Sequence, residues 1–179
     1  MSALMRYILM KDISLFFLFN QRLHSHLLYI FMRWVTEMGS PIFAVGLTLY
    51  FLILSKNPSQ LTGIKMAAIL IFSQTIVQLT KRIVNRPRPY QALENVCDSK
   101  TTRCVYSFPS GHTCAAFSMA FVLADSFPFL SISFLGLAGL VGISRIYLGA
   151  HYPTDVLAGI VIAYASLAAE KFILFSSLF

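Results

Sequence analysis

Long apolar runs recur along this chain, and each is closed by proline or by a few polar residues. Five of them follow one another, at about residues 41–55, 61–84, 110–127, 129–147 and 153–175. A helix needs about 20 apolar residues to cross a bilayer, and it satisfies its own backbone polar groups there. Only 12% of the residues are charged, about half the share found in soluble domains. The pattern excludes a soluble globular protein and predicts an all-α integral membrane bundle of about five transmembrane helices.

Residues 1–38 depart from this pattern. Charged and polar side chains interrupt the segment so often that no part of it reaches spanning length. Leu27, Phe31 and Trp34 are among the residues that would form one apolar side of a helix at the membrane surface. We therefore predict a single membrane-embedded domain over residues 1–179, with amphipathic interfacial helices within residues 1–38 and the helical bundle at 39–179.

Short links between the apolar runs make neighbouring helices antiparallel. The second run ends at Lys81–Arg88 on the face where the third begins at Ser110, and the fourth returns to Arg145 on that same face. Three stretches that are distant in the sequence are thus expected to meet at one membrane surface. Within the runs, small residues such as Gly136, Gly139 and Gly142 are expected to let helix backbones approach closely.

Positive charge is concentrated near this predicted meeting point. The net charge is +7, and six of the 14 basic residues lie between positions 81 and 103 (Lys81, Arg82, Arg86, Arg88, Lys100 and Arg103). No aromatic residues alternate with them as they do in single-strand-binding proteins. The distribution argues against nucleic acid as a partner and favours an anionic lipid headgroup at the membrane surface.

The run Pro109-Ser110-Gly111-His112 stands directly before an apolar helix. Serine is a good N-cap, and a helix N-terminus offers unpaired N–H groups and a positive dipole end to an anion. Gly111 would let an anion come close to the backbone, and His112 would lie within reach of it. The plain structural alternative is an ordinary capped helix with an interfacial histidine.

The third cluster of polar residues follows the fourth run. Arg145 ends that run with a planar guanidinium that suits a phosphate. Asp155 lies one helical turn after His151, so its carboxylate could hold one ring nitrogen and leave the other free as a nucleophile or base. A lone histidine–aspartate pair is more often structural, and a lone Lys81 would simply extend its ammonium to the interface. Their convergence at one membrane face favours a functional site.

These residues resemble a known signature. The spacing Lys81, six residues, Arg88-Pro89, then Pro109-Ser110-Gly111-His112, then Ser144-Arg145, five residues, His151, three residues, Asp155 is similar to the three-part motif of the type-2 phosphatidic acid phosphatase superfamily. All eleven positions of that motif are present in order. The resemblance covers residues 81–155 directly, and the helical layout extends it over most of the chain.

The resemblance implies a phosphatase that uses neither a metal nor another cofactor. In that reaction His151 attacks phosphorus to form a phosphohistidine, and Asp155 orients His151. His112 protonates the leaving oxygen and then activates water. The phosphoryl oxygens are held by Lys81, Arg88, Ser110, Gly111 and Arg145. Three cations and a helix N-terminus can stabilise the charge of a phosphoryl transition state without a metal.

Several substrates and roles are compatible with this pattern. The expected substrate is a lipid phosphate or diphosphate, with undecaprenyl diphosphate or phosphatidylglycerophosphate favoured. A lipid A 1-phosphatase and a lipid phosphotransferase of the same family are alternatives. From other classes, a transporter or an inactive lipid-binding scaffold also has to be considered. The oligomeric state does not follow from the sequence.

Two cysteines bear on the compartment. Cys97 and Cys104 lie in the polar loop before Ser110 and enclose six residues. A disulfide between them would require an oxidising environment. The expected location is a bacterial inner membrane, with the catalytic face on the periplasmic or extracellular side, which is also what the resemblance implies.

Overall fold

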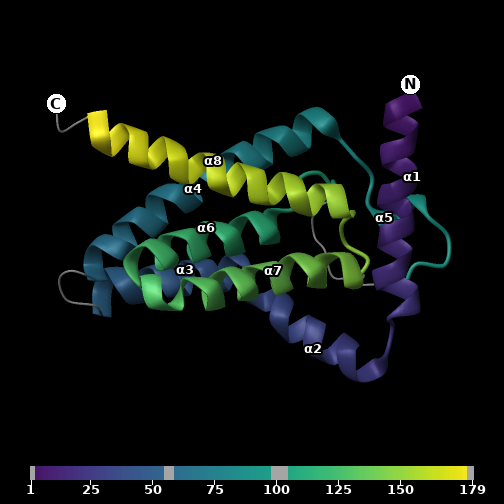
Figure 1. Ribbon diagram of the computed structural model, residues 1–179, viewed down its shortest axis with the longest axis horizontal. Coiled ribbons are helices and arrows are strands. Elements are labelled where there is room, and N and C mark those ends of the chain that lie inside the picture. The colour runs from purple at the N-terminus through teal and green to yellow at the C-terminus, as the bar shows by residue number, and fades with distance from the viewer. Residues whose placement is uncertain (1–2, 55–58, 98–104, 177–179) are drawn as a thin grey trace.

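The computed structural model describes residues 3–54, 59–97 and 105–176. The helices are α1 (Ala3–Phe17), α2 (His26–Glu37), α3 (Pro41–Leu49), α4 (Ser59–Val84), α5 (Pro89–Ala92), α6 (Gly111–Ser126), α7 (Ser131–Tyr147) and α8 (Pro153–Ser176) (Figure 1). Short π-helical turns follow α1 over Leu18–Arg22 and α3 over Tyr50–Leu54, and a 3-10 turn, Pro128–Leu130, precedes α7. In these described residues the only strand-like pairing is one bridge between Pro87 and Tyr106. The all-α fold predicted from the sequence is confirmed.

Local sequence explains where the main helices begin and end. The hydroxyl of Ser110 accepts a hydrogen bond from the Thr113 N–H at 3.4 Å and so caps α6. The prolines at 87 and 89 exclude helix before and through themselves, and α4 ends at Val84. Asn85 follows with a φ of +49°, a left-handed conformation that asparagine tolerates at a helix end.

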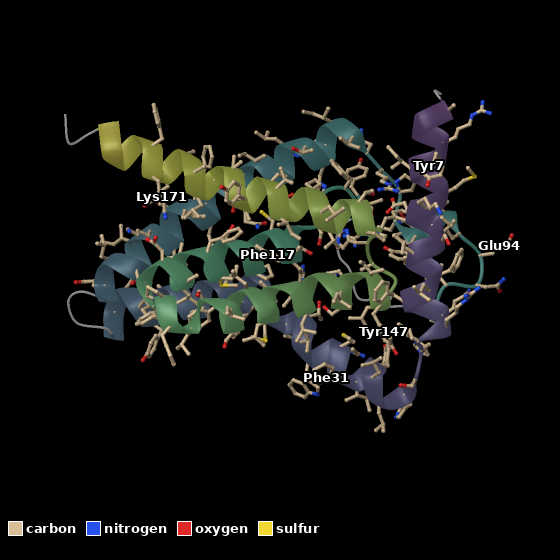
Figure 2. All side chains as sticks on the ribbon, in the orientation of Figure 1. Tyr7, Phe31, Glu94, Phe117, Tyr147 and Lys171 are labelled. Carbon is tan, nitrogen blue, oxygen red and sulfur yellow. The ribbon has the colours of Figure 1, made fainter. Side chains whose placement is uncertain are left out.

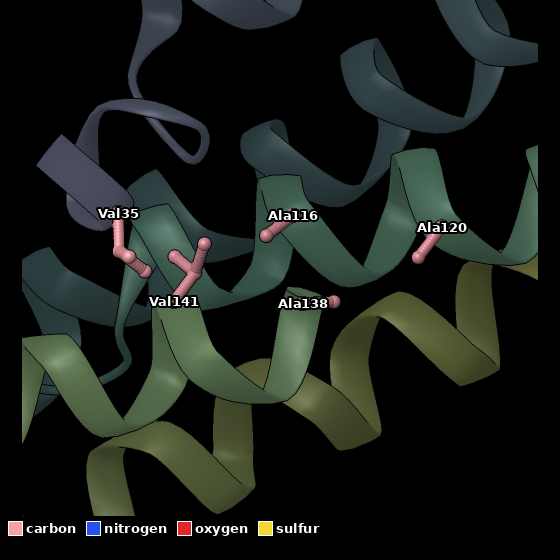
Figure 3. Packing of buried hydrophobic residues seen from close by; sticks show 5 residues of the cluster. All are labelled: Val35, Ala116, Ala120, Ala138 and Val141. Carbon is pink, nitrogen blue, oxygen red and sulfur yellow. The ribbon is translucent and has the colours of Figure 1, made fainter. Parts of the chain in front are cut away.

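The bundle is built around α6, which packs against α4, α7 and α8. Figure 3 shows one part of this core, where small and β-branched side chains from α2, α6 and α7 meet (Val35, Ala116, Ala120, Ala138 and Val141). Alanine at three of these positions lets the helix backbones approach closely, which favours association where lipid offers no hydrophobic driving force.

The glycines behave differently from one another. A Cβ at Gly142 would lie 3.0 Å from an α8 side chain, but Cβ atoms at Gly136 and Gly139 would meet nothing within 4 Å. The expected close packing is therefore present at Gly142 and wrong for the other two. A Cβ at Gly159, in α8, would lie 2.7 Å from the carbonyl oxygen of Ser110. Close approach of α8 to the start of α6 requires glycine there.

Two helices in the described part of the chain are long and apolar enough to cross a membrane, Gln60–Val84 and Pro128–Tyr147. The pair His26–Glu37 and Pro41–Ile53 would make a third span, bent by 48°. The first predicted run, 41–55, thus forms α3 and its π-helical turn, and it continues from α2 across the bend. The predicted runs at 110–127 and 153–175 form α6 and α8.

The N-terminal segment closes one end of the bundle. In Figure 1, α1 lies across the end where α7 finishes and α8 begins, and it packs on α8. Phe16 on α1 is fully buried and its ring contacts that of Tyr152 at 5.8 Å between centroids. In α2 the side chain of Phe31 points away from the bundle (Figure 2), and Trp34 is 75% exposed, whereas Met32 is buried. The amphipathic face predicted for residues 27–35 is present in α2, but α1 is packed against the bundle.

Candidate active site

The predicted site residues gather at the end of the bundle that α1 covers. They come from the end of α4, the residue before α5, the start of α6, the end of α7, the α7–α8 link and the start of α8 (Lys81, Arg88, Ser110, Gly111, His112, Arg145, His151 and Asp155). Six of the eight are buried, and Gly111 and His112 are partly exposed. The antiparallel alternation of helices inferred from the sequence places these distant stretches together, as expected.

His151 presents its two ring nitrogens to opposite surroundings. Nδ1 lies 3.5 Å from Oδ2 of Asp155, and Nε2 lies 3.4 Å from Nη1 of Arg88. At this distance the buried Nδ1 has no hydrogen-bond partner among the described residues, and catalytic contacts of this kind often tighten only when substrate binds. Nε2 is therefore the nitrogen that faces the Arg88 guanidinium, and Nδ1 faces the carboxylate.

Burial sets the protonation of His151. The side chain lies in the link between α7 and α8 and is 1% exposed. Loss of hydration lowers its pKa to about 3, and the neighbouring Arg145 and Arg88 act in the same direction against the opposing effect of Asp155. The imidazole is therefore neutral at physiological pH, which leaves a lone pair on Nε2.

Three of the predicted cations are buried at this end of the bundle. The exposed fractions of Arg88, Arg145 and Lys81 are 2%, 4% and 6%. Arg88 donates from Nη1 to the Ala150 carbonyl oxygen at 2.9 Å, and all three cations act electrostatically on His112. Buried charge is costly unless it is compensated, so this arrangement is suited to an anion.

Arg145 has unused hydrogen-bonding capacity. Its Nη1 donates to Oγ1 of Thr36, in α2, at 2.8 Å. Its Nε is buried and has no hydrogen-bond partner among the described residues. An orphaned guanidinium N–H is rare in protein interiors, and a phosphoryl oxygen would satisfy it. Thr36 was not predicted from the sequence, because nothing local marks a threonine 109 residues away as a partner of Arg145.

The start of α6 offers backbone donors. Ser110 donates its backbone N–H to the Asp155 carbonyl oxygen at 3.0 Å, and its hydroxyl lies 2.8 Å from that of Thr113. The cap predicted at Ser110 is confirmed, and the hydroxyl is already engaged within the protein. A Cβ at Gly111 would make only ordinary contacts, 3.5 Å to Gln74 and 3.6 Å to Val77. Packing therefore does not account for glycine at position 111.

Three residues that sequence reasoning left without a role surround Asp155. Its Oδ1 accepts from Nη1 of Arg86 at 2.7 Å, and its Oδ2 accepts from the Ser107 hydroxyl and from the Tyr152 N–H at 2.9 Å. The sequence placed Arg86 only among the basic residues of the patch. A signal was available, because alternate residues of an extended Arg-Pro-Arg-Pro run point in the same direction.

One predicted feature lies outside the described residues. Cys104 falls in the interval 98–104, and Cys97, its predicted partner, is a free cysteine in the structure, which does not support the predicted disulfide. Cys97 itself is held by its backbone, which donates to Oδ1 of Asn20 at 2.9 Å and accepts from Nδ2 of Asn20 at 2.7 Å.

The sequence profile of the PAP2 superfamily matches residues 62–175, which include every predicted site residue. The chain belongs to this superfamily. The resemblance inferred from the spacing of the motif is thereby confirmed.

Known proteins with a similar sequence or structure include phosphatases. A lipid A 1-phosphatase of Rhizobium etli is 36% identical over 104 residues, covering 55% of this chain and 44% of that protein. The crystal structure of Aquifex aeolicus LpxE is 30% identical and superposes with a TM-score of 0.74 over 87% of this chain and 94% of that one.

A second structure supports the fold alone. It is the PAP2 type phosphatidylglycerolphosphate phosphatase of Bacillus subtilis, with 24% identity and a TM-score of 0.70 over 93% of this chain and 88% of that one. The match to the first curated relative covers less than half of that relative's length.

Proposed function

We propose that this chain is a membrane lipid phosphatase that works through a phosphohistidine, with residues 1–179 acting as one domain. The observation that carries the proposal is a site with three buried cations that all act electrostatically on His112, in which Arg88 lies 3.4 Å from Nε2 of His151 and the Arg145 Nε has no hydrogen-bond partner among the described residues. A tetrahedral phosphoryl group would bring negative charge to these cations and a hydrogen-bond acceptor to the Arg145 Nε.

In the first step, the lone pair on Nε2 of His151 attacks phosphorus while the bond from phosphorus to the leaving oxygen breaks. The leaving oxygen takes a proton from His112. Arg88, Arg145 and Lys81 hold the equatorial oxygens together with the first N–H groups of α6. Asp155 stabilises the positive charge that develops on the His151 ring and keeps its proton on Nδ1.

In the second step, water attacks the phosphorus that is bonded to Nε2 of His151 and gives a proton to His112. The bond between phosphorus and Nε2 breaks, and its electron pair returns to the imidazole. Inorganic phosphate leaves, and both histidines recover their starting protonation. No metal is needed in this scheme, because the side-chain cations supply the charge stabilisation.

The substrate is proposed to be an amphiphile that enters from the leaflet. An open, shallow groove of about 310 Å³ on the surface of α4 is lined by polar and apolar side chains of that helix (Gln74, Thr75, Gln78, Leu79 and Arg82). Gln74 also donates to the Gly111 carbonyl oxygen at 3.2 Å, so this groove adjoins the start of α6. Undecaprenyl diphosphate and phosphatidylglycerophosphate remain the favoured substrates, and the identity to a lipid A 1-phosphatase supports lipid A 1-phosphate as a third.

We place the protein in a bacterial inner membrane with this site on the periplasmic or extracellular side. The relatives from bacteria support the membrane, and a Cys97–Cys104 disulfide would support the face. Alkylation of both thiols in freshly prepared membranes, without reductant, would contradict that orientation argument.

The test is release of inorganic phosphate by purified protein in detergent with EDTA. Undecaprenyl diphosphate, phosphatidylglycerophosphate and lipid A are offered in parallel. We expect release from at least one lipid, loss of about a thousandfold or more in His151→Ala, since a covalent nucleophile is removed, and inhibition by vanadate. The exposed His26→Ala in α2 is the matched control and should keep wild-type turnover.

Other outcomes separate the alternatives. Phosphate transfer to a second lipid without free phosphate would identify a phosphotransferase. Full activity in His151→Ala, or complete inhibition by EDTA, would overturn the proposed mechanism. Binding of lipid phosphates without turnover would identify an inactive scaffold, and lipid movement across vesicles without hydrolysis would identify a transporter.

A further inference from the structure

A charged side chain of the N-terminal helix is buried beside the proposed catalytic centre. Asp12, in α1, is 4% exposed. The sequence indicates no role in the site for residues 1–38, and Asp12 is one of the charged residues that interrupt the apolar sequence of that segment. A carboxylate is almost never fully buried unless it is paired, so its partners indicate what it is for.

Asp12 binds the first turn of α8. Its Oδ1 accepts the Thr154 backbone N–H at 2.9 Å, and its Oδ2 accepts the Thr154 hydroxyl at 2.6 Å. It therefore satisfies one of the open N–H groups of α8 and places negative charge at the positive end of that helix, as an N-cap would, although it comes from a different helix. The next residue in α8 is Asp155.

Arg86 connects Asp12 to Asp155. Its Nη2 lies 2.8 Å from Oδ2 of Asp12, and its Nη1 lies 2.7 Å from Oδ1 of Asp155 and 2.8 Å from the Thr154 hydroxyl. Its guanidinium also stacks over the ring of Tyr152 at 3.9 Å. The planar fork thus has a fixed orientation, with one carboxylate on each terminal nitrogen.

This arrangement determines which oxygen of Asp155 is available to His151. Arg86 occupies Oδ1, and Oδ2, which also accepts from the Ser107 hydroxyl and the Tyr152 N–H, is the oxygen 3.5 Å from Nδ1 of His151. Arg86 shares its charge between Asp12 and Asp155. It therefore orients Asp155 but neutralises it less than a cation paired with Asp155 alone would. If Asp12 lost its charge, Arg86 would attract Asp155 more strongly and weaken its hold on the imidazole.

We propose that Asp12 and Arg86 are positioning residues for the phosphatase reaction, and that α1 is thereby part of the active-site architecture. The expected effect on kcat rests on the proposed function. The contacts alone also predict a change in the tautomer of the His151 ring, which can be measured without turnover.

The experiment compares Asp12→Asn and Arg86→Lys with wild type in detergent. Asn keeps the size of Asp12 but not its charge, and Lys keeps the charge of Arg86 but cannot bridge two carboxylates. Both variants should lower kcat by about tenfold or more, a loss typical of residues that orient an active-site ligand, with KM within twofold of wild type. Glu94→Gln, an exposed carboxylate changed in the same way, should leave kcat unchanged.

A second readout uses ¹⁵N-labelled histidine. We expect the wild-type His151 ring to be uniformly in the Nδ1–H tautomer and both variants to lose that uniformity, which a purely structural effect elsewhere in α1 would not cause. Wild-type kcat in both variants, or a loss of kcat that follows the thermal midpoint with the tautomer unchanged, would overturn the proposal. If the wild-type enzyme itself shows no His151-dependent turnover, the proposed function fails, and the tautomer result still decides the positioning role.

Discussion

His151 combines a reactive nitrogen with nearly complete exclusion from water. Its neutral state follows from burial and from the cations at Arg88 and Arg145. Burial and the neighbouring cations both help a nucleophile that must attack an anionic phosphate. They keep the ring unprotonated in mildly acidic surroundings, and the same cations bind the phosphate.

The residue-scale prediction concerns pH. With a pKa lowered to about 3, His151 should stay neutral from pH 8 to pH 5 in the ligand-free enzyme, as followed by ¹⁵N-histidine NMR with His151→Asn to identify its resonances. An unfolded histidine has a pKa of about 6.5, so below that value the folded state binds fewer protons. The contribution of His151 to stability is complete above pH 6.5 and is lost as the pH falls toward 3. Titration of this ring near pH 6 would contradict the structure.

At this scale the sequence predicted the contacts that its spacing marks and missed those that only the fold creates. His151 and Asp155 are four residues apart on the chain, so their pairing could be foreseen. Asp12 and Thr154 are 142 residues apart, and nothing near Asp12 in the sequence identifies its partner. Long-range positioning of this kind depends on tertiary packing.

At the scale of elements, the limits of the helices were predictable because prolines and capping residues act locally. The C-terminal end of α4 follows from Pro87, and the start of α6 follows from Ser110. The direction of α1 was not predictable, since its residues carry both apolar and charged side chains and only packing on α8 determines which are buried. The contacts of the glycines were not predictable either, because they depend on which neighbouring helix lies against each glycine.

The element-scale prediction uses two glycines in neighbouring helices. Gly159→Ala should destabilise the protein in detergent by about 1–3 kcal/mol, the usual cost of overpacking, because its Cβ would lie 2.7 Å from a backbone oxygen. Gly139→Ala should be neutral or stabilising by up to about 1 kcal/mol, since it gains helix propensity and meets nothing within 4 Å. Thermal unfolding of both variants decides this, and equal midpoints would contradict the close α6–α8 approach.

At the scale of the whole molecule, the bundle has charged side chains near both ends. Lys65 and Lys171 both contact Asp125, at 3.4 and 2.8 Å, at the end opposite the candidate site. Sixteen residues separate Lys65 from Lys81, and sixteen separate Asp155 from Lys171. At about 1.5 Å per residue these intervals are about 24 Å long, shorter than a typical hydrocarbon core of about 30 Å.

The corresponding prediction is a dependence on bilayer thickness. In vesicles made from phosphatidylcholines of increasing acyl length, with a fixed fraction of lipid phosphate substrate, kcat/KM should be highest in the thinner bilayers. Because the charged side chains at the two ends are only about 24 Å apart, longer acyl chains force the bilayer to thin around the protein or leave these charges below the headgroups. Rates that are the same across the series, with equal protein incorporation, would contradict this expectation.

The short interval between the charged ends has a consequence for how a lipid reaches the pocket. If the surrounding leaflet bends inward to meet the protein, a headgroup arrives at the depth of Arg88 and Arg145 while its acyl chains remain in hydrocarbon. The membrane then bears part of the work of presenting the phosphate, because a lipid held in a dimple need not be lifted out of the bilayer before it reacts. Stiff or thick membranes would resist that dimple, and the mechanical properties of the bilayer would become a determinant of turnover alongside the side chains.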